Sequence, residues 1–248
     1  MKQHKGQELI EREFSVATFN IAAANFSSVV DLQQFIAERG AEFVGLQEVD
    51  EYTQRNPLSM IEAIAGSTYS YSQFSAAMPL ESGEYGNGLV GKVRPFAYKE
   101  LRYSTYGLEP RTAQLANFYL GNNQVLTVCN THLSFESAEI RSAQVEELLA
   151  EVADFGGEYR VIMGDFNMDQ DKEEWQQFVG EYNLVNGHDN HWLDTFHKED
   201  ATMKSFSIDN IMVSNNIDVL AVDVIKNELS DHYMLEAKIK IKEGGKND

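Results

Sequence analysis

A strand, a helix and a second strand follow one another at the start of this chain, and this order restricts its fold more than any other feature of the sequence. The run FSVATFN (14–20) is β-rich and largely apolar, and AEFVGLQEV (41–49) has the same character. Between them, apolar side chains recur at helical spacing from Val29 to Ile36, with a serine before the segment and Gly40 after it. This alternation is typical of an α/β unit.

Strands, loops and helices continue to alternate along the rest of the chain. Between Thr68 and Gly121, β-rich runs are separated by the turn clusters ESGEYGNG (81–88) and YGLEPR (106–111), which predict hairpins with long loops. The later predicted elements are a strand at 123–134, a helix at 137–155, a strand at 159–165, a short helix at 171–179, a polar loop with His188, His191 and His197, and strands at 205–214 and 233–241. The three loop histidines lack a compact ligand spacing, so we interpret them as solvated.

The pattern is uninterrupted by repeats, low-complexity segments or linkers. We therefore predict one domain over residues 1–248, with frayed ends at 1–12 and 243–248. Hydrophobic residues make up 43% of the chain, which is enough for a sizeable core. Cys129 is the only cysteine, so no intrachain disulfide can form and a reducing, cytoplasmic compartment is favoured. No apolar run has the length of about 18 residues that a transmembrane segment needs, and the N-terminus lacks a signal-peptide core.

The net charge bears on the class of partner. With 39 acidic and 20 basic residues the formal charge is −19, and such a surface repels polyanions. Long nucleic acid is therefore a less favoured partner than a small substrate. Acidic residues that hold a divalent metal contribute to the same count, however, and are neutralised when the ion binds.

Polar residues of one chemical kind stand at the ends of five predicted strands. Strand ends in layered α/β proteins meet at one rim, so residues far apart in sequence can share one site. Carboxylate and amide oxygens gathered there suit Mg²⁺ or Mn²⁺. The residues are Asn20, Glu48, His132, Asp165 with Asn167, and Asp231 with His232, while Asp209 lies within the predicted strand 205–214.

Each of these residues also has a purely structural interpretation. Asp or Asn after an apolar strand is commonly a turn former or a helix cap, and a lone histidine is commonly a satisfied core residue. The motif GDFN (164–167) alone would not decide between the two. The ordered set of motifs favours the functional interpretation.

The ordered set resembles the endonuclease/exonuclease/phosphatase superfamily, whose signatures read here as TFNI, LQEVD, NTHLS, GDFN, SIDNIMVS and SDHYML, from Asn20 to His232. The resemblance implies an α/β fold, a four-layer α/β/β/α sandwich of two packed β-sheets flanked by helices. It also implies a divalent-metal site that cleaves phosphate esters. By the same resemblance, Glu48 is the principal metal carboxylate, and Asn20 and Asp231 lie close to the same Mg²⁺ or Mn²⁺ ion or its waters.

The resemblance also implies catalytic roles. Asp165 and Asn167 align the attacking water and the phosphoryl oxygen, and His132 donates to a phosphoryl oxygen. Asp209 accepts a hydrogen bond from His232, whose other ring nitrogen faces the phosphate or the nucleophile. Whether Asp165 or His232 takes the proton from water, and whether one or two metals bind, both stay open.

Some features bear on the branch of the family and on the substrate. NTHLS (130–134) stands where the abasic-site endonuclease branch carries a Tyr-x-Pro-Asn segment, so the chain is more similar to the phosphodiesterase and phosphatase branches, which include sphingomyelinases. Arg55, Asn87 and Arg111 are candidate substrate-binding residues in loops after the early strands. Arginine suits bidentate contact with phosphate, and a surface ion pair is the alternative for Arg111.

Two departures from the family pattern stand near the motifs. Asn210 replaces the aromatic residue often found after the Asp of SID, and NMDQDKEEW (167–175) places an acidic stretch beside the expected site. We expect both to reshape a substrate pocket without touching the metal.

Three functions are compatible with these observations. The leading hypothesis is a metal-dependent hydrolase of phosphodiester or phosphomonoester bonds in a small or lipid-like phosphate ester. The second is an endo- or exonuclease acting on DNA or RNA, which the charge and the missing Tyr-x-Pro-Asn segment disfavour. The third is a binding protein that kept the fold and lost catalysis. The sequence argues against it, because every expected catalytic position holds a competent residue.

Overall fold

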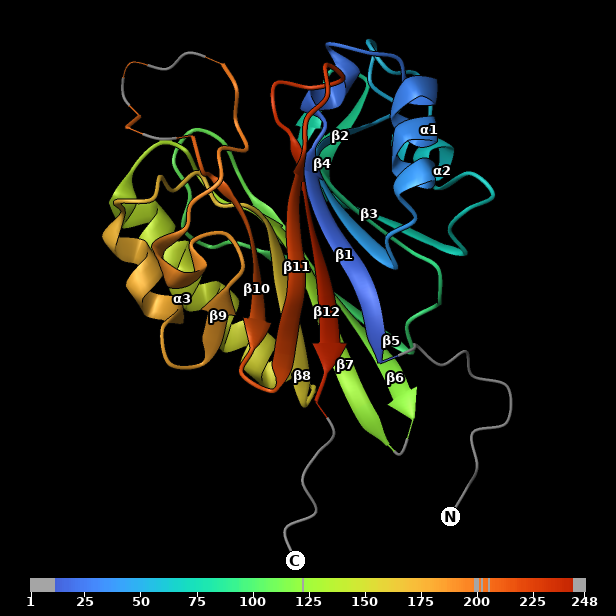
Figure 1. The fold of residues 1–248 in the computed structure, drawn as a ribbon. Helices are drawn as coiled ribbons and strands as arrows, with labels where there is room; N and C mark the ends of the chain where they lie inside the picture. Colours follow the sequence, from blue (N-terminus) through green and yellow to red (C-terminus); the bar gives the residue numbers. More distant parts are fainter. Residues whose placement is uncertain (1–11, 122, 199–200, 202, 205, 243–248) are drawn as a thin grey trace, which may run out of the picture.

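Two six-stranded sheets form the frame of the molecule (Figure 1), in strand orders β11-β12-β1-β2-β4-β3 and β5-β6-β7-β8-β10-β9. The structure is a computed structural model that describes residues 12–121, 123–198, 201, 203–204 and 206–242. The predicted α/β sandwich of two packed sheets is confirmed. The predicted frayed ends, 1–12 and 243–248, lie outside the described residues except for Arg12.

The first sheet and its outer layer come from the two ends of the chain. Helices α1 and α2 cover the outer face of this sheet (Figure 1). The elements are β1 Glu13–Asn20, the 3-10 turn η1 Ala22–Ala24, α1 Val29–Arg39, β2 Phe43–Glu51, α2 Met60–Ala65, β3 Tyr71–Leu80, β4 Gly83–Gly91, β11 Ile217–Ile225 and β12 Met234–Ile241.

The second sheet is built from the middle of the chain, and helix α3 covers its outer face. The elements are β5 Ala97–Arg102, β6 Thr112–Gly121, β7 Gln124–His132, α3 Ala138–Phe155, β8 Tyr159–Asp165, the 3-10 helix η2 Glu173–Phe178, β9 Tyr182–Leu184, the 3-10 turn η3 His188–Asn190 and β10 Asp209–Ser214.

The two long helices begin and end where the sequence predicts. Ser28 caps α1 in a capping box with Asp31, and Gly40 ends it in the left-handed conformation at φ 66°. Ser137 caps α3 by accepting a hydrogen bond from the Ile140 amide. These local signals fix the two outer layers against the sheets.

Apolar side chains fill three layers. One cluster lies between the sheets, where the Phe43 and Phe118 rings approach to 4.5 Å between centroids. The second lies under α1 and α2 and the third under α3. Among the described residues, no helix is long and apolar enough to cross a membrane.

The prediction of a turn over the cluster ESGEYGNG is wrong for most of the cluster. Only Glu81 and Ser82 form the turn, and strand β4 begins at Gly83. A side-chain carbon on Gly83 would stand 2.0 Å from the Glu51 carbonyl oxygen, and one on Gly86 would stand 2.0 Å from that of Ser75. These glycines therefore permit close strand contacts, and Asn87 lies in a buried strand and not in a loop.

Strand β11 and helix α2 are absent from the sequence prediction. In β11, the register with β12 shifts between Val219 and Ala221, so the strand lacks a regular apolar alternation. Its position at the edge of the sheet also leaves Leu220 exposed. The edge position and the irregular register together explain why the sequence pattern of β11 does not indicate a strand.

Strand directions bring the predicted polar residues to one rim. β1 and β2 are parallel, with Asn20 beside Gln47, and β7 and β8 are parallel, with His132 beside Asp165. β10 runs antiparallel to β8, so its first residue, Asp209, lies opposite Asp165.

Candidate active site

Asp165 lies at the centre of the candidate site, at the end of β8. Its side chain is 2% exposed. Its Oδ2 lies 3.0 Å from Asn20 Nδ2, 3.5 Å from His132 Nε2 and 3.8 Å from His232 Nε2. Asn167 donates its backbone N–H to the other oxygen, Oδ1, at 2.9 Å. Residues from two other strands, β1 and β7, and from two loops, which hold Asn167 and His232, thus meet at a single carboxylate.

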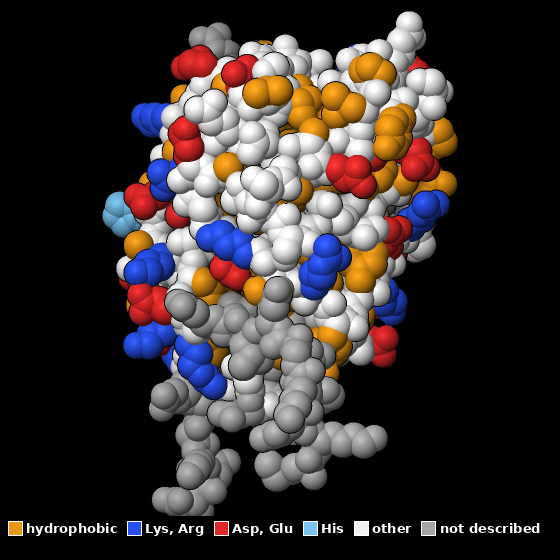
Figure 2. Space-filling view, turned by 90° about the vertical axis from the view of Figure 1, so that its right-hand side faces the viewer, with side chains coloured by type: hydrophobic (Ala, Val, Ile, Leu, Met, Phe, Trp, Pro, Cys, Tyr) orange, Lys and Arg blue, Asp and Glu red, His pale blue; other side chains and the backbone are white. Residues whose placement is uncertain are grey.

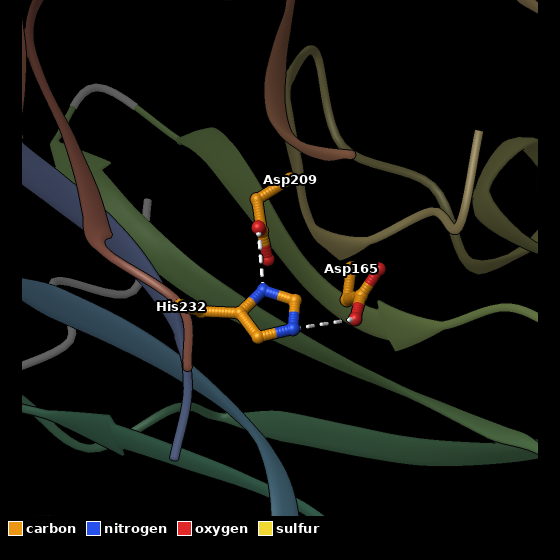
Figure 3. Close-up of side chains that lie close together, drawn as sticks. All are labelled: Asp165, Asp209 and His232. Carbon is orange, nitrogen blue, oxygen red and sulfur yellow. Dashed lines mark hydrogen bonds and ion pairs between the residues drawn. The ribbon is translucent and has the colours of Figure 1, made fainter. Parts of the chain in front are cut away.

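His232 stands between two buried aspartates (Figure 3). Its Nδ1 lies 2.8 Å from Asp209 Oδ2, the hydrogen bond that the family resemblance implies, and its Nε2 faces Asp165. Burial alone would lower the pKa of His232, but the charge of Asp209 and the hydrogen bond to it raise that pKa to about 10. Burial, followed by the charge of Asp209, raises the pKa of Asp165 to about 7.

His132 is in the opposite electrostatic setting. Arg111 Nη1 lies 3.2 Å from His132 Nδ1. Because a guanidinium can only donate, Nδ1 accepts and the ring proton sits on Nε2, which faces Asp165. Burial and the charges of Arg111 and His232 lower the pKa of His132 well below its ordinary value. Asn167 Nδ2 donates to the Leu133 carbonyl oxygen at 3.0 Å. It also lies 3.1 Å from His132 Nε2, and in this tautomer the contact is a close approach of two donors and not a hydrogen bond.

Glu48 and Asn20 form a second part of the site. Asn20 Nδ2 donates to Glu48 Oε1 at 3.1 Å as well as to Asp165, and its Oδ1 accepts from the Ala22 amide at 3.0 Å. Glu48 is half-buried and has a φ of 56°, in the left-handed region that is unfavourable for a residue with a side chain. The strand β2 is irregular at this point, and the irregularity directs the carboxylate toward Asn20.

Asp231 is half-buried and is joined to the rest of the site through Ser230. Ser230 Oγ donates to the Asn20 carbonyl oxygen at 2.7 Å and lies 3.3 Å from Asp231 Oδ1. The charge of Asp231 also contributes to the raised pKa of His232. Ser230 was not among the residues that the sequence singled out.

The donor set fits a divalent cation. Asp165, Asp209 and Asp231 act on His232 by their charge, and Asn20 joins Glu48 to Asp165. Buried like charges are unfavourable unless a cation compensates them. Asp165, Asp209 and His232 offer ligand atoms that lie within 4.8 Å of one another. Oxygen-rich donors of this kind suit Mg²⁺ or Mn²⁺.

Arg111 lies beside His132, and its ion pair with Glu109 is largely buried and not at the surface. It is 5% exposed, and its Nη1 contacts Glu109 Oε1 at 2.9 Å as well as His132. Its Nε is buried without a hydrogen-bond partner, and its guanidinium lies 5.9 Å from the centroid of the Phe135 ring. Arg111 is therefore a cation that is fixed at the site.

The other two substrate-binding candidates are engaged with the protein. Arg55 donates to both oxygens of the buried Asp50 carboxylate, at 2.6 and 2.9 Å. Asn87 Nδ2 donates to the Thr112 carbonyl oxygen at 2.7 Å. A contact of Arg55 or Asn87 with substrate stays a prediction.

The loop histidines differ from one another. His188 and His191 are exposed, in agreement with the prediction. The prediction is wrong for His197, whose ring stacks on Tyr233 at 4.5 Å between centroids and whose Nε2 lies 2.8 Å from the Ser230 carbonyl oxygen. The reason is the bridge between Phe196 and His232, which lays this loop along the site.

Two departures from the family pattern have structural partners in this chain. Asn210 is fully buried, accepts a hydrogen bond from the Asn186 amide and donates to the Asn186 carbonyl oxygen. In the acidic stretch, Asp169 is buried and accepts from the Lys204 amide at 2.9 Å. An effect of either residue on a substrate pocket stays a prediction.

Tyr85 is a site residue that the sequence analysis missed. It is buried in β4, and burial, the charge of Glu48 and the neighbouring Glu109 raise its pKa, while Arg111 opposes this change. Tyr85 stands directly before Gly86 in the cluster ESGEYGNG, which suggested a turn, so its burial in a strand could not be predicted.

Comparisons with known proteins bear on the family and the fold of the chain. Residues 17–232 match the model of the Endonuclease/Exonuclease/phosphatase family. A search of curated proteins finds no significant match.

Solved structures share the fold at low sequence identity. An endonuclease/exonuclease/phosphatase from Beutenbergia cavernae DSM 12333 superposes with a TM-score of 0.75 at 18% identity, over 93% of this chain and 72% of that one. The human Nocturnin catalytic domain with a bound sulfate anion gives 0.75 at 17%, over 95% and 97%. A Bacteroides thetaiotaomicron VPI-5482 mannosyl-6-phosphatase gives 0.66 at 16%, over 91% and 99%.

Proposed function

The chain belongs to the endonuclease/exonuclease/phosphatase family, and on that basis we propose that it is a divalent-metal-dependent hydrolase of phosphate esters. The observation that supports this proposal most directly is the convergence of Asn20, His132 and His232 on one oxygen of Asp165. Such a set of donors and acceptors matches the needs of phosphoryl transfer, in which charge on the phosphoryl oxygens must be stabilised while water is positioned.

In this proposal Glu48, Asn20 and Asp231 hold Mg²⁺ or Mn²⁺. When bound, the ion neutralises charge on the phosphate and makes water more acidic. Glu48 and Asp231 are the half-buried carboxylates of the site, so they are open to an ion and a substrate that arrive from solvent.

The other site residues bind and orient. His132 carries its proton on Nε2 and donates toward the phosphoryl oxygen, because Arg111 occupies Nδ1. Asp209 fixes the ring of His232, so its Nε2 faces the space beside Asp165. Asp165 and Asn167 position the attacking water, and Asp165 and His232 are the two candidates for its proton.

The proposed substrate is a small phosphate ester. Arg111 supplies a fixed cation beside His132, which suits an anionic oxygen. One structural neighbour is a mannosyl-6-phosphatase, and this supports the inclusion of phosphomonoesters beside diesters. On the face drawn in Figure 2, Lys and Arg side chains lie interspersed with Asp and Glu, an arrangement that offers little attraction to a long polyanion.

Cytoplasm is the proposed compartment, since Cys129 is unpaired and buried.

Hydrolysis by metal-stripped protein tests the proposal. The full chain is treated with EDTA and assayed on p-nitrophenyl phosphate, bis(p-nitrophenyl) phosphate and a short oligonucleotide, before and after addition of Mg²⁺ or Mn²⁺. His232→Ala serves as the control for contaminating hydrolases. Metal-restored cleavage that depends on His232 supports the proposal, and the preferred ester assigns the substrate class.

Other results would change the assignment. Activity that survives EDTA contradicts the metal mechanism. Salt-sensitive cleavage of the oligonucleotide alone would assign a nuclease. A chain that binds Mn²⁺ but cleaves no ester in a broad panel would be a binding protein.

A further inference from the structure

The carboxylate of Glu48 projects from a bulge in strand β2. β2 and β4 pair regularly from Phe43 with Gly91 to Leu46 with Gly88, and pairing resumes at Val49 with Gly86. Two residues of β2, Gln47 and Glu48, therefore lie opposite one residue of β4, Asn87. The left-handed conformation of Glu48 follows from this extra residue. Such a conformation persists only where the surroundings hold it.

Asn130 supplies that support from the opposite sheet. It lies in β7, two residues before His132, and it is fully buried. Its Nδ2 donates to the carbonyl oxygens of Leu46 at 3.0 Å and Gly88 at 2.8 Å. These two residues are the last regular pair before the bulge, so a single amide clamps both strands at the point where their register changes.

The orientation of the Asn130 amide is fixed by its other neighbours. Gln47 Nε2 donates to Asn130 Oδ1 at 2.7 Å and to Thr18 Oγ1 at 3.0 Å. Gln47 is itself the first residue of the bulge, so the bulge and the amide hold one another. Space for the amide exists because residue 45 is glycine, where a side-chain carbon would stand 2.6 Å from Asn130 Oδ1.

We propose that Asn130 is a positioning residue that sets the place of Glu48 relative to His132 and Asp165. The inference rests on the proposed function, in which Glu48 holds the metal. Asn130 and His132 lie on the same face of β7, because they are two residues apart in one strand. One rigid strand therefore carries His132 at its end and fixes the bulge of Glu48 through Asn130. Loss of the amide frees the bulge and displaces the metal carboxylate without removing any group that touches metal or substrate.

Two measurements on the full-length, metal-free chain test this inference. The first is the affinity for Mn²⁺, followed by electron paramagnetic resonance. The second is amide hydrogen exchange in peptides that cover residues 44–50. Asn130→Ala is the test variant, and Glu48→Gln is the reference for loss of the metal carboxylate.

Asn117→Ala is the matched control. Asn117 is also a buried asparagine of the second sheet, and its Nδ2 donates to a carbonyl oxygen, that of Phe155, at 3.2 Å. It pairs with Thr127, five residues before His132, so it lies about 16 Å from the site by strand rise. Gly45→Ala is a second test variant, because its new methyl group meets the Asn130 amide and leaves all the hydrogen-bonding groups present.

Asn130→Ala should bind Mn²⁺ about 10- to 100-fold more weakly, the range found when groups that orient a metal ligand are removed. It should also exchange amides faster over 44–50, whereas Asn117→Ala should change neither quantity. If Asn130→Ala yields no folded protein, Gly45→Ala decides by the same two readouts.

Two other outcomes are distinguishable. If Glu48→Gln loses Mn²⁺ while Asn130→Ala binds like Asn117→Ala, the positioning role is overturned and the proposed function stands. If the wild-type chain binds no Mn²⁺, or Glu48→Gln binds as well as wild type, the proposed metal site is wrong and the positioning role falls with it.

Discussion

The two sides of Asp165 carry the same side chain, an imidazole, in opposite settings. On one side His232 is backed by the buried carboxylate of Asp209, and on the other His132 is backed by the guanidinium of Arg111. Both rings are buried, so burial opposes a positive charge on each. The charged partner decides the difference, since the pKa of His232 is raised and that of His132 is lowered.

This difference separates two tasks that one kind of residue can perform. A histidine with an aspartate behind it is stabilised as a cation and can stand against negative charge, whereas a histidine with an arginine behind it is a neutral donor with a fixed tautomer. The partners reach the site from different places: Asp209 begins β10, and Arg111 directly precedes β6. The asymmetry is therefore a property of the fold and not of either motif alone.

Removal of the His232 ring should have the largest effect on activity. In His232→Ala we expect kcat to fall by about 10³- to 10⁴-fold, near the upper end of what a positioned acid or base contributes. Circular dichroism and the melting temperature should show a folded chain, because the side chain contacts the site more than the core. Near-normal turnover in a folded variant would remove His232 from the proposed mechanism.

Asp209→Asn removes the carboxylate behind His232, so that His232, like His132, has no negative charge behind its ring. The amide keeps the shape of the carboxylate but removes the charge that favours the His232 cation. We expect kcat to fall by about 10²- to 10³-fold, within the range for loss of an acid or base function, with little change in KM. Steady-state kinetics on the preferred ester checks this, and a change confined to KM would show that Asp209 affects binding only.

Arg111→Met tests the other side of the comparison. Without the guanidinium, the pKa of His132 should rise but stay below its ordinary value, because burial, its largest cause, remains. We expect about a 10- to 100-fold loss of kcat/KM, mainly through KM, since Arg111 would also lose its contact with the phosphate. Arg111→Lys should not restore activity, because an ammonium lacks the planar fork. An unchanged KM together with an unchanged His132 resonance in NMR titration would contradict both roles.

The sequence predicted residues that stand at the ends of strands far better than it predicted their partners. Asn20, His132 and Asp165 were found because each ends a largely apolar strand, and such a pattern is local. Arg111 contacts His132 across 21 positions of the sequence, and His197 stacks on Tyr233 across 36. The strands that Asn130 clamps lie at least 42 positions away from it. Those contacts depend on strand register and sheet packing, which no local pattern encodes.

The two errors about glycine and histidine have the same origin. Gly83 and Gly86 looked like turn formers, yet they are needed because another backbone passes within contact distance. His197 looked solvated, yet its ring is half-buried and stacks on Tyr233. In each case the local interpretation agreed with the usual preference of that residue type, but a segment distant in the sequence determined its surroundings.

Arg55 offers the mildest test, because it looks like Arg111 in sequence but has a different partner. Its guanidinium binds the fully buried Asp50, and Arg55 itself is 39% exposed. Arg55→Met should leave kcat nearly unchanged. It should lower the free energy of unfolding by about 1–2 kcal/mol at neutral pH, a value reduced from that of a buried pair because solvent screens the arginine.

The loss of stability in Arg55→Met should depend on pH. Burial alone would raise the pKa of Asp50, but hydrogen bonds from Arg55, Asn56 and Thr53 lower it below its ordinary value. A carboxyl group whose pKa is lower in the folded chain than in the unfolded chain stabilises the fold at a pH above its unfolded pKa of about 3.9. This contribution is lost as the pH falls through the pKa of the folded chain. The difference between wild type and Arg55→Met should therefore be constant from about pH 7 to 5 and shrink below about pH 4. Urea unfolding at a series of pH values measures it, and a difference that grows in acid would show that Arg55 acts through a group other than Asp50.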